Sequence, residues 1–151
     1  MNTLAMYNRL TKLPLGKQIF SKTVCLAAPY FSSIKPKISE LKPGLCQVHM
    51  KKRRRVQNHL KTVHAIAMCN MAELSAGLMM DVSVPKGARW IPAGMEVQYL
   101  KKAKTHLTAV ADGQAIDWKT QGDVMVPVRV TDTQDNLVFS AQVRMNIKHK
   151  S

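Results

Sequence analysis

Two polar side chains at a fixed spacing are the residues in this chain best suited to chemistry. Asn58 precedes a predicted helix, and Glu73 lies fifteen positions later, inside that helix. A side-chain amide, the free backbone N–H groups of a helix N-terminus and one carboxylate are what acyl transfer requires when no serine triad or metal is used. The pair therefore points to acyl-transfer chemistry.

The helix that carries Glu73 is the clearest element of the chain. Residues 63–80 are apolar on nearly every side, and Thr62 is the expected N-cap. A helix that is apolar all round is expected to be buried, here by a sheet that wraps around it. Asn70 and Glu73 are its polar exceptions.

The remaining sequence predicts two helices followed mainly by strands. Helices are expected over 3–12 and 16–30, with a break between them at Pro14-Leu15-Gly16. Alternation of apolar and polar residues predicts one strand that starts near Cys46, runs into the Lys51–Arg55 cluster and ends near Asn58. Further strands are expected after the long helix, around 95–99, 107–111, 124–130 and 139–147.

These strands follow one another closely, so they should be antiparallel. The expected fold class is therefore α+β, with one long helix against a curved antiparallel sheet. Residues 1–34 are expected to form an N-terminal helical segment packed on a domain of residues 35–151.

Charge and cysteine content limit the partners. Net charge is +14, of which residues 1–61 carry +12 and residues 62–151 carry +2. Such a field attracts polyanions, whether nucleic acid, anionic lipid or a phosphorylated ligand such as coenzyme A. Nucleic acid is disfavoured because no aromatic residue lies between Phe31 and Trp90, whereas the basic N-terminal helix keeps a membrane surface as a weak alternative. The three cysteines form no CxxC or zinc-type pattern, so we expect free thiols, no metal and a cytoplasmic protein.

One segment resembles a known signature. The residues concerned are Asn58-His59-Leu60-Lys61-Thr62-Val63-His64-Ala65, followed by Glu73. This arrangement resembles the signature of hotdog-fold acyl-CoA thioesterases of the phenylacetate-pathway type, and most of all that of their DUF4442 branch. The family pattern is Asn, a short loop usually containing Gly, His-Gly or His-Ala, and then a helix with Asp or Glu. Tyr99-Leu100-Lys101-Lys102-Ala103-Lys104 is also similar to the strand that follows in that family. The resemblance covers residues 40–148.

The resemblance implies a hotdog fold and a thioester hydrolase. Its substrate would be acyl-CoA or another acyl thioester, with no further cofactor, and its assembly a homodimer or dimer of dimers. In such enzymes the Asn places the water or the thioester, a backbone N–H at the helix start polarises the carbonyl, and the carboxylate is base or nucleophile. These roles fall on Asn58, the N–H near Ala65, and Glu73. Apart from these roles, we expect Arg55 to bind the substrate, because the basic run leads directly into the site, and we add His64 and Lys61 as substrate-binding candidates. Lys61 stands where Gly is common in the family.

Helix geometry adds one condition to this assignment. Ala65 and Glu73 are eight positions apart, which separates them by about 12 Å along a helix axis. They cannot both touch one thioester carbon from the same chain, so a catalytic site would combine two chains.

Two alternatives remain. Ala65-Ile66 and Lys61 replace glycines of the family pattern, which favours a non-catalytic hotdog module that binds acyl-CoA or lipid. In that case Glu73 would be a structural carboxylate bonded across a dimer, and Asn58 a turn residue. A basic surface-binding protein is the third hypothesis.

Overall fold

The computed structural model describes residues 2–150, which form one sheet and the helices packed on it. The helices are α1 (Thr3–Leu10), α2 (Gly16–Ala27) and α3 (Ala65–Ser83), with 3-10 turns η1 (Pro29–Ile34) and η2 (Arg54–Val56). The strands are β1 (Lys37–Lys42), β2 (Leu45–Met50), β3 (Arg89–Tyr99), β4 (Leu107–Asp112), β5 (Gly122–Thr131) and β6 (Leu137–Lys148).

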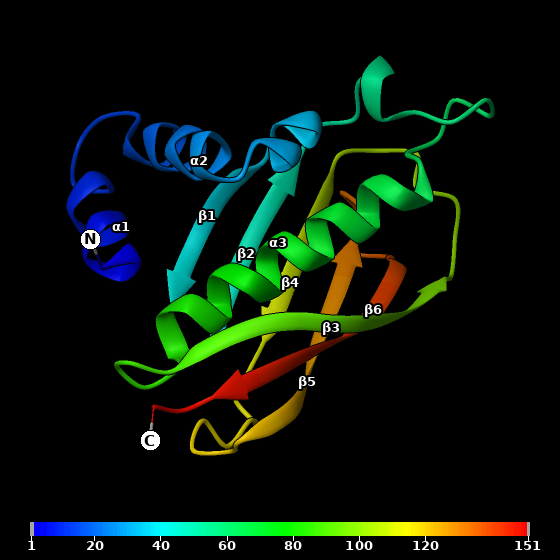
Figure 1. The fold of residues 1–151 in the computed structure, drawn as a ribbon. Coiled ribbons are helices and arrows are strands. Elements are labelled where there is room, and N and C mark those ends of the chain that lie inside the picture. Colours follow the sequence, from blue (N-terminus) through cyan, green and yellow to red (C-terminus); the bar gives the residue numbers. More distant parts are fainter. Residues whose placement is uncertain (1, 151) are drawn as a thin grey trace.

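The six strands form one antiparallel sheet in the order β1-β2-β4-β5-β6-β3. Strand β3 directly follows α3 but pairs with β6, so β1 and β3 are the two edges. Helix α3 crosses one face of the sheet, which curves around it (Figure 1). The α+β class and the long helix wrapped by the sheet are as the sequence predicts.

Helix α3 packs one side on the sheet and leaves the other open. Met71, Ala72, Ala76 and Met79 are fully buried against the strands. Ile66 on the outer side is 54% exposed. By length and composition alone this helix could cross a membrane, but most of it is buried in the fold, as in the core helix of many soluble proteins. The expectation of burial on every side is therefore wrong for the single chain.

The N-terminal helices lie beside β1 and α3 (Figure 1). The Tyr7 hydroxyl donates to the Ser39 carbonyl at 3.0 Å, and the Ser21 hydroxyl accepts the Ile38 N–H at 2.9 Å. The turn between α1 and α2 requires glycine at position 16, because a Cβ there would lie 1.7 Å from the Leu10 carbonyl oxygen. These contacts fix α1 and α2 against the domain.

Two local predictions are wrong, and one strand was not predicted. The strand starting near Cys46 ends at Met50, and the basic cluster that follows forms a connection and the η2 turn rather than a strand. Strand β1 (Lys37–Lys42) was not among the predicted strands. The N-cap of α3 is His64 instead of Thr62: the His64 Nδ1 accepts the Ile66 N–H at 3.0 Å, while Thr62 bonds to Asn58.

Candidate functional site

The structure distributes the predicted site residues over three hollows. Asn58 and Ala65 line one hollow, here called the Ala65 hollow, together with Tyr99 at the end of β3. Arg55 and His64 line a second, the Arg55 hollow, against η1. Glu73 lines the third, the Glu73 cavity. Lys61 is exposed on the loop beside the Ala65 hollow.

Asn58 organises the loop that leads into α3. Its Oδ1 accepts the Leu60 N–H at 3.0 Å and the Thr62 N–H at 3.1 Å, and its Nδ2 lies 2.9 Å from the Thr62 hydroxyl oxygen, to which it donates. Lys61 adopts the left-handed conformation, with φ of +60°. That backbone conformation favours glycine, which explains why glycine is common there in the family pattern.

The loop is also fixed to its surroundings by backbone hydrogen bonds. The Val63 N–H donates to the Ala103 carbonyl and the His64 N–H to the Val56 carbonyl, both at 2.8 Å. The start of α3 is therefore held from both sides, and the position of its first N–H groups is well defined.

The Ala65 N–H is the free donor at the start of α3. The Ile66 N–H is taken by the His64 ring, and those of Ala67 and Met68 donate to the His64 carbonyl. The Ala65 N–H has no acceptor within residues 2–150. A helix N-terminus carries partial positive charge, so this N–H is suited to bind an oxyanion or a polarised carbonyl.

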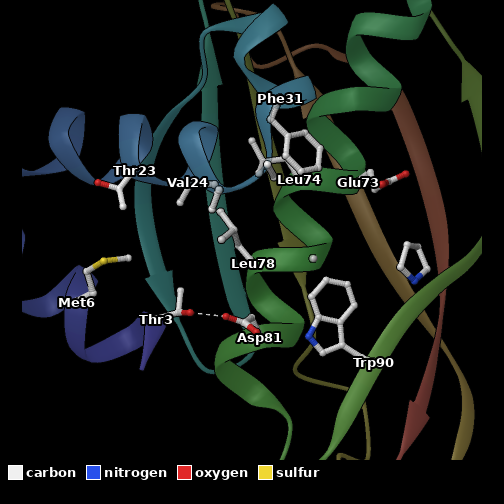
Figure 2. Close-up of a pocket in the computed structure, with 14 residues that line it drawn as sticks. Thr3, Met6, Thr23, Val24, Phe31, Glu73, Leu74, Leu78, Asp81 and Trp90 are labelled. Atoms are coloured by element: carbon white, nitrogen blue, oxygen red, sulfur yellow. Dashed lines mark hydrogen bonds between the residues drawn. The ribbon is translucent and has the colours of Figure 1, made fainter. Parts of the chain in front are cut away.

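Glu73 is exposed on the outer side of α3 and makes no ion pair with the residues the structure describes. Its carboxylate points away from Phe31 and Leu74 (Figure 2). The cavity that it lines has a volume of about 480 Å³, and Trp90 and Pro92 of β3 line the same cavity. A free carboxylate beside an apolar cavity is an arrangement for activating water next to an apolar substrate.

The cavity runs along the outer side of α3. Leu74 and Leu78 form its floor (Figure 2). Trp90 lies against Gly77, where a Cβ would be 3.0 Å from the ring atom Cη2. Near the C-terminal part of α3, Thr3 donates a hydrogen bond from its hydroxyl to the Asp81 carboxylate.

A single chain does not bring Ala65 and Glu73 together. They line different hollows, and eight helical positions separate them by about 12 Å along the axis. His64 and Arg55 do share one hollow. Within residues 2–150, no three His, Cys, Asp or Glu side chains are grouped so that they could hold a metal ion.

Two residues of these hollows were not predicted. Trp90 forms a wall of the Glu73 cavity. The sequence offers one indication of this contact, a large aromatic residue that follows a helix containing Gly77, against which its ring lies. Asn70 lines the Arg55 hollow, is 8% exposed, and has a side-chain oxygen without a hydrogen-bond donor in the described part of the chain. The sequence does mark Asn70 as a polar residue in an apolar helix, but this pattern alone assigns it no role in a site.

Comparisons with known proteins give the family. A crystal structure of the genomics target APC5556 is 45% identical, with a TM-score of 0.89, and the match covers 98% of this chain and 99% of that one. The Haemophilus influenzae thioesterase HI1161 is 12% identical with a TM-score of 0.74, over 84% and 87% of the two chains. The Pseudomonas aeruginosa protein PA5026, described as a probable thioesterase of unknown function, is 16% identical with a TM-score of 0.77, over 91% and 97%.

At these low identities the last two share the fold alone, and it is the hotdog fold that the sequence predicts. None of the curated proteins compared with the chain matches it. The family model described as "Domain of unknown function (DUF4442)" matches residues 16–147. The chain therefore belongs to the DUF4442 family and has the hotdog fold.

Proposed function

We propose that this protein is an acyl thioester hydrolase that works as a homodimer. Glu73 of one chain activates water, and the partner subunit's Ala65 N–H binds the oxygen of the thioester carbonyl. The observation that carries the proposal is the Ala65 N–H at the N-terminus of a 19-residue helix, which has no acceptor among residues 2–150. Similarity in fold to proteins named as thioesterases adds support.

Strand β3 supports the two-chain arrangement. It is an edge of the sheet, and most of its residues are exposed on both faces, including Ile91 at 62% and Tyr99 at 57%. An edge strand with free N–H and C=O groups is a template for pairing with another chain. Proline within it, at position 92, also fits an edge.

Pairing of β3 with its copy in a second chain would complete the site. In a two-fold antiparallel pair, the Tyr99 end of one strand lies beside the Arg89 end of the other. The Ala65 hollow contains Tyr99, and the Glu73 cavity contains Trp90. Such a pair therefore brings the Ala65 hollow of one chain beside the Glu73 cavity of the other, twice per dimer.

The proposed chemistry then follows from the residues. Glu73 removes a proton from a water molecule, which attacks the thioester carbon. The negative charge that develops on the carbonyl oxygen is bound by the partner subunit's Ala65 N–H at the positive helix end. The C–S bond breaks, the carboxylic acid forms, and the leaving thiolate takes up the proton held by Glu73, which returns to its carboxylate form. In this proposal Asn58 positions the loop before Ala65.

The Arg55 hollow is the proposed site for the polar part of the substrate. Arg55 and His64 line it together, and the segment Lys51–Arg55 that enters it is basic. Coenzyme A carries phosphates, which such a surface attracts. Lys61, exposed on the loop between Leu60 and Thr62 of the Ala65 hollow, adds one more cation.

A second candidate is a non-catalytic module that binds an acyl thioester. It is favoured by Asn58, whose side-chain oxygen and nitrogen already bond to Leu60 and Thr62 of its own loop. Such an amide orders the chain and needs no substrate to satisfy it.

Hydrolysis of a panel of acyl-CoA thioesters by the wild type, Glu73→Gln and Ala65→Pro tests the proposal. Loss of the base should lower kcat by about 10²–10⁴-fold, and loss of one oxyanion donor by about 10²–10³-fold. Proline is well tolerated at the first helical position. His64 before it has ψ of 137°, the extended conformation that a following proline requires.

Asp81→Asn is the matched control, because Asp81 is the other carboxylate of α3 in the same cavity. With an acyl-CoA that carries a short acyl chain as the substrate, the Asp81→Asn variant should be as active as the wild type. Equal rates for wild type and Glu73→Gln would rule out the proposed mechanism. Tight binding of acyl-CoA with no turnover by the wild type would favour the second candidate instead.

A further inference from the structure

The Glu73 cavity is apolar along its length and polar at both ends. Between Glu73 and Asp81 its walls are made by apolar or small residues of four elements: Leu74, Gly77 and Leu78 of α3, Val24 and Ala27 of α2, Phe31 of η1 and Trp90 of β3. Figure 2 shows Met6 and Thr23 on the side opposite to Trp90. Its volume of about 480 Å³ lies within the range of small-molecule sites.

The N-terminal helices make one whole side of this cavity. Without α1 and α2 the outer face of α3 here would be a flat apolar surface beside β3. Ala27 and Ala28 present small side chains to the cavity, and this leaves a channel where larger residues would fill the space between the helices.

The apolar channel has a defined length. Along α3, Glu73 lies toward one end of the cavity and Asp81, bonded to Thr3, toward the other (Figure 2). Eight helical residues span about 12 Å. The hollow next to this pair is lined by the charged residues Lys86 and Arg89 as well as by apolar residues such as Val82 and Val84. A chain that passed the Thr3–Asp81 pair would therefore meet charged side chains there.

We infer that this channel binds an unbranched acyl chain of medium length, with its carbonyl end at Glu73 and its methyl end at the Thr3–Asp81 pair. The inference rests on the proposed function for the identity of the thioester, while the channel itself is independent of catalysis. A zigzag alkyl chain with C–C bonds of about 1.5 Å advances roughly 1.3 Å per carbon, so about nine carbons fill 12 Å.

Each methylene that enters the channel leaves water and meets apolar walls. Burial of one methylene tightens binding by about fourfold. Beyond about nine carbons the chain meets the carboxylate of Asp81 and the charged hollow behind it, where a methylene gains nothing. Affinity should therefore rise steeply with chain length and then level off.

The test uses S-alkyl thioethers of coenzyme A in a series of increasing chain length, with binding measured by isothermal titration calorimetry. A thioether has no carbonyl and is not hydrolysed, so the measurement does not depend on turnover. For the wild type we expect about fourfold tighter binding per methylene and a break near nine carbons.

Ala27→Phe should fill the channel and move the break to shorter chains. Losing two buried methylenes weakens binding of the nine-carbon thioether by about sixteenfold. Leu26→Phe is the matched control, since Leu26 is 82% exposed on the same helix and lies outside the cavity walls. Thr23→Leu, at another wall position of α2, is the second variant if Ala27→Phe does not fold.

The outcomes separate this inference from the proposed function. A steady gain through long chains, no binding of any thioether, or the same break in the wild type and both wall variants would overturn the inference. If the wild type hydrolyses acyl-CoA in any of those cases, the proposed function stands alone. A break that moves in the wall variants, in a protein without hydrolysis, supports the acyl channel and rejects the enzyme.

Discussion

Glu73 and Ala65 lie on one helix yet line different hollows, the first beside Trp90 and the second beside Tyr99. These two aromatic residues stand near opposite ends of the edge strand β3. In the proposed mechanism, each chain would therefore carry half of a site near each end of this exposed strand. Two copies that pair along this strand would form two complete sites.

Disruption of the β3 edge should separate the chains. In Ile91→Lys a solvated charge replaces an exposed apolar side chain on the edge strand, a device that prevents edge pairing. We expect a folded monomer without hydrolase activity, measured by light scattering, circular dichroism and a thioester assay. Met125→Lys is the control, because Met125 is 41% exposed on the interior strand β5. An active Ile91→Lys dimer would show that the chains pair elsewhere.

The left-handed backbone at Lys61 should make glycine stabilising there. A residue with a Cβ in this conformation destabilises the folded chain by about 1–2 kcal/mol. Glycine removes that cost, but its greater freedom in the unfolded chain offsets about 0.5–1 kcal/mol of the gain. Lys61→Gly should therefore raise the free energy of unfolding by about 0.5–1 kcal/mol in urea titrations. Lys61→Ala keeps the Cβ and should give no such gain. Equal stability of the two variants would contradict the argument.

His49 should make the fold less stable in mild acid. Partial burial lowers the pKa of His49, and the cations Lys37 and Lys17 lower it further. Between this lowered pKa and about 6.5, the unfolded chain binds a proton that the folded chain does not. The free energy of unfolding should therefore fall as the pH falls through that window and change no further below it.

His49→Gln should remove this part of the pH dependence, as followed by urea unfolding at a series of pH values. The native ring contacts Thr108, with Nδ1 2.7 Å from the hydroxyl oxygen. His59→Gln, at an exposed position, should keep the wild-type slope. An unchanged slope in His49→Gln would place the titrating group elsewhere.

The sequence predicts the fold where the period of the pattern is undisturbed. Alternating valines from Val124 to Val130 pair with β6 in a long regular ladder, and the hairpin is confirmed. Strand β1 was missed because a bulge between Ile38 and Glu40 breaks its alternation, so that the buried residues Ile38 and Leu41 are three positions apart. A period of three does not indicate a strand.

The site was less predictable because its surroundings come from distant segments. The family spacing points to Asn58 and Glu73 as candidate site residues. Nothing in the local sequence shows, however, that the side-chain amide of Asn58 already donates a hydrogen bond to Thr62. The apolar neighbours of Glu73 in sequence suggested burial, whereas α3 turns that side chain away from the sheet. Trp90 and the α2 wall reach the cavity only through tertiary packing.

Mixed dimers test the central claim, a site shared between two chains, most directly. Glu73→Gln and Ala65→Pro are each expected to be inactive alone. In a heterodimer of the two, one site combines an intact Glu73 with an intact Ala65 N–H, and the other site has neither. Random exchange of subunits should therefore restore about a quarter of the wild-type rate. A mixture that exchanges subunits and stays as inactive as its components would contradict the shared site.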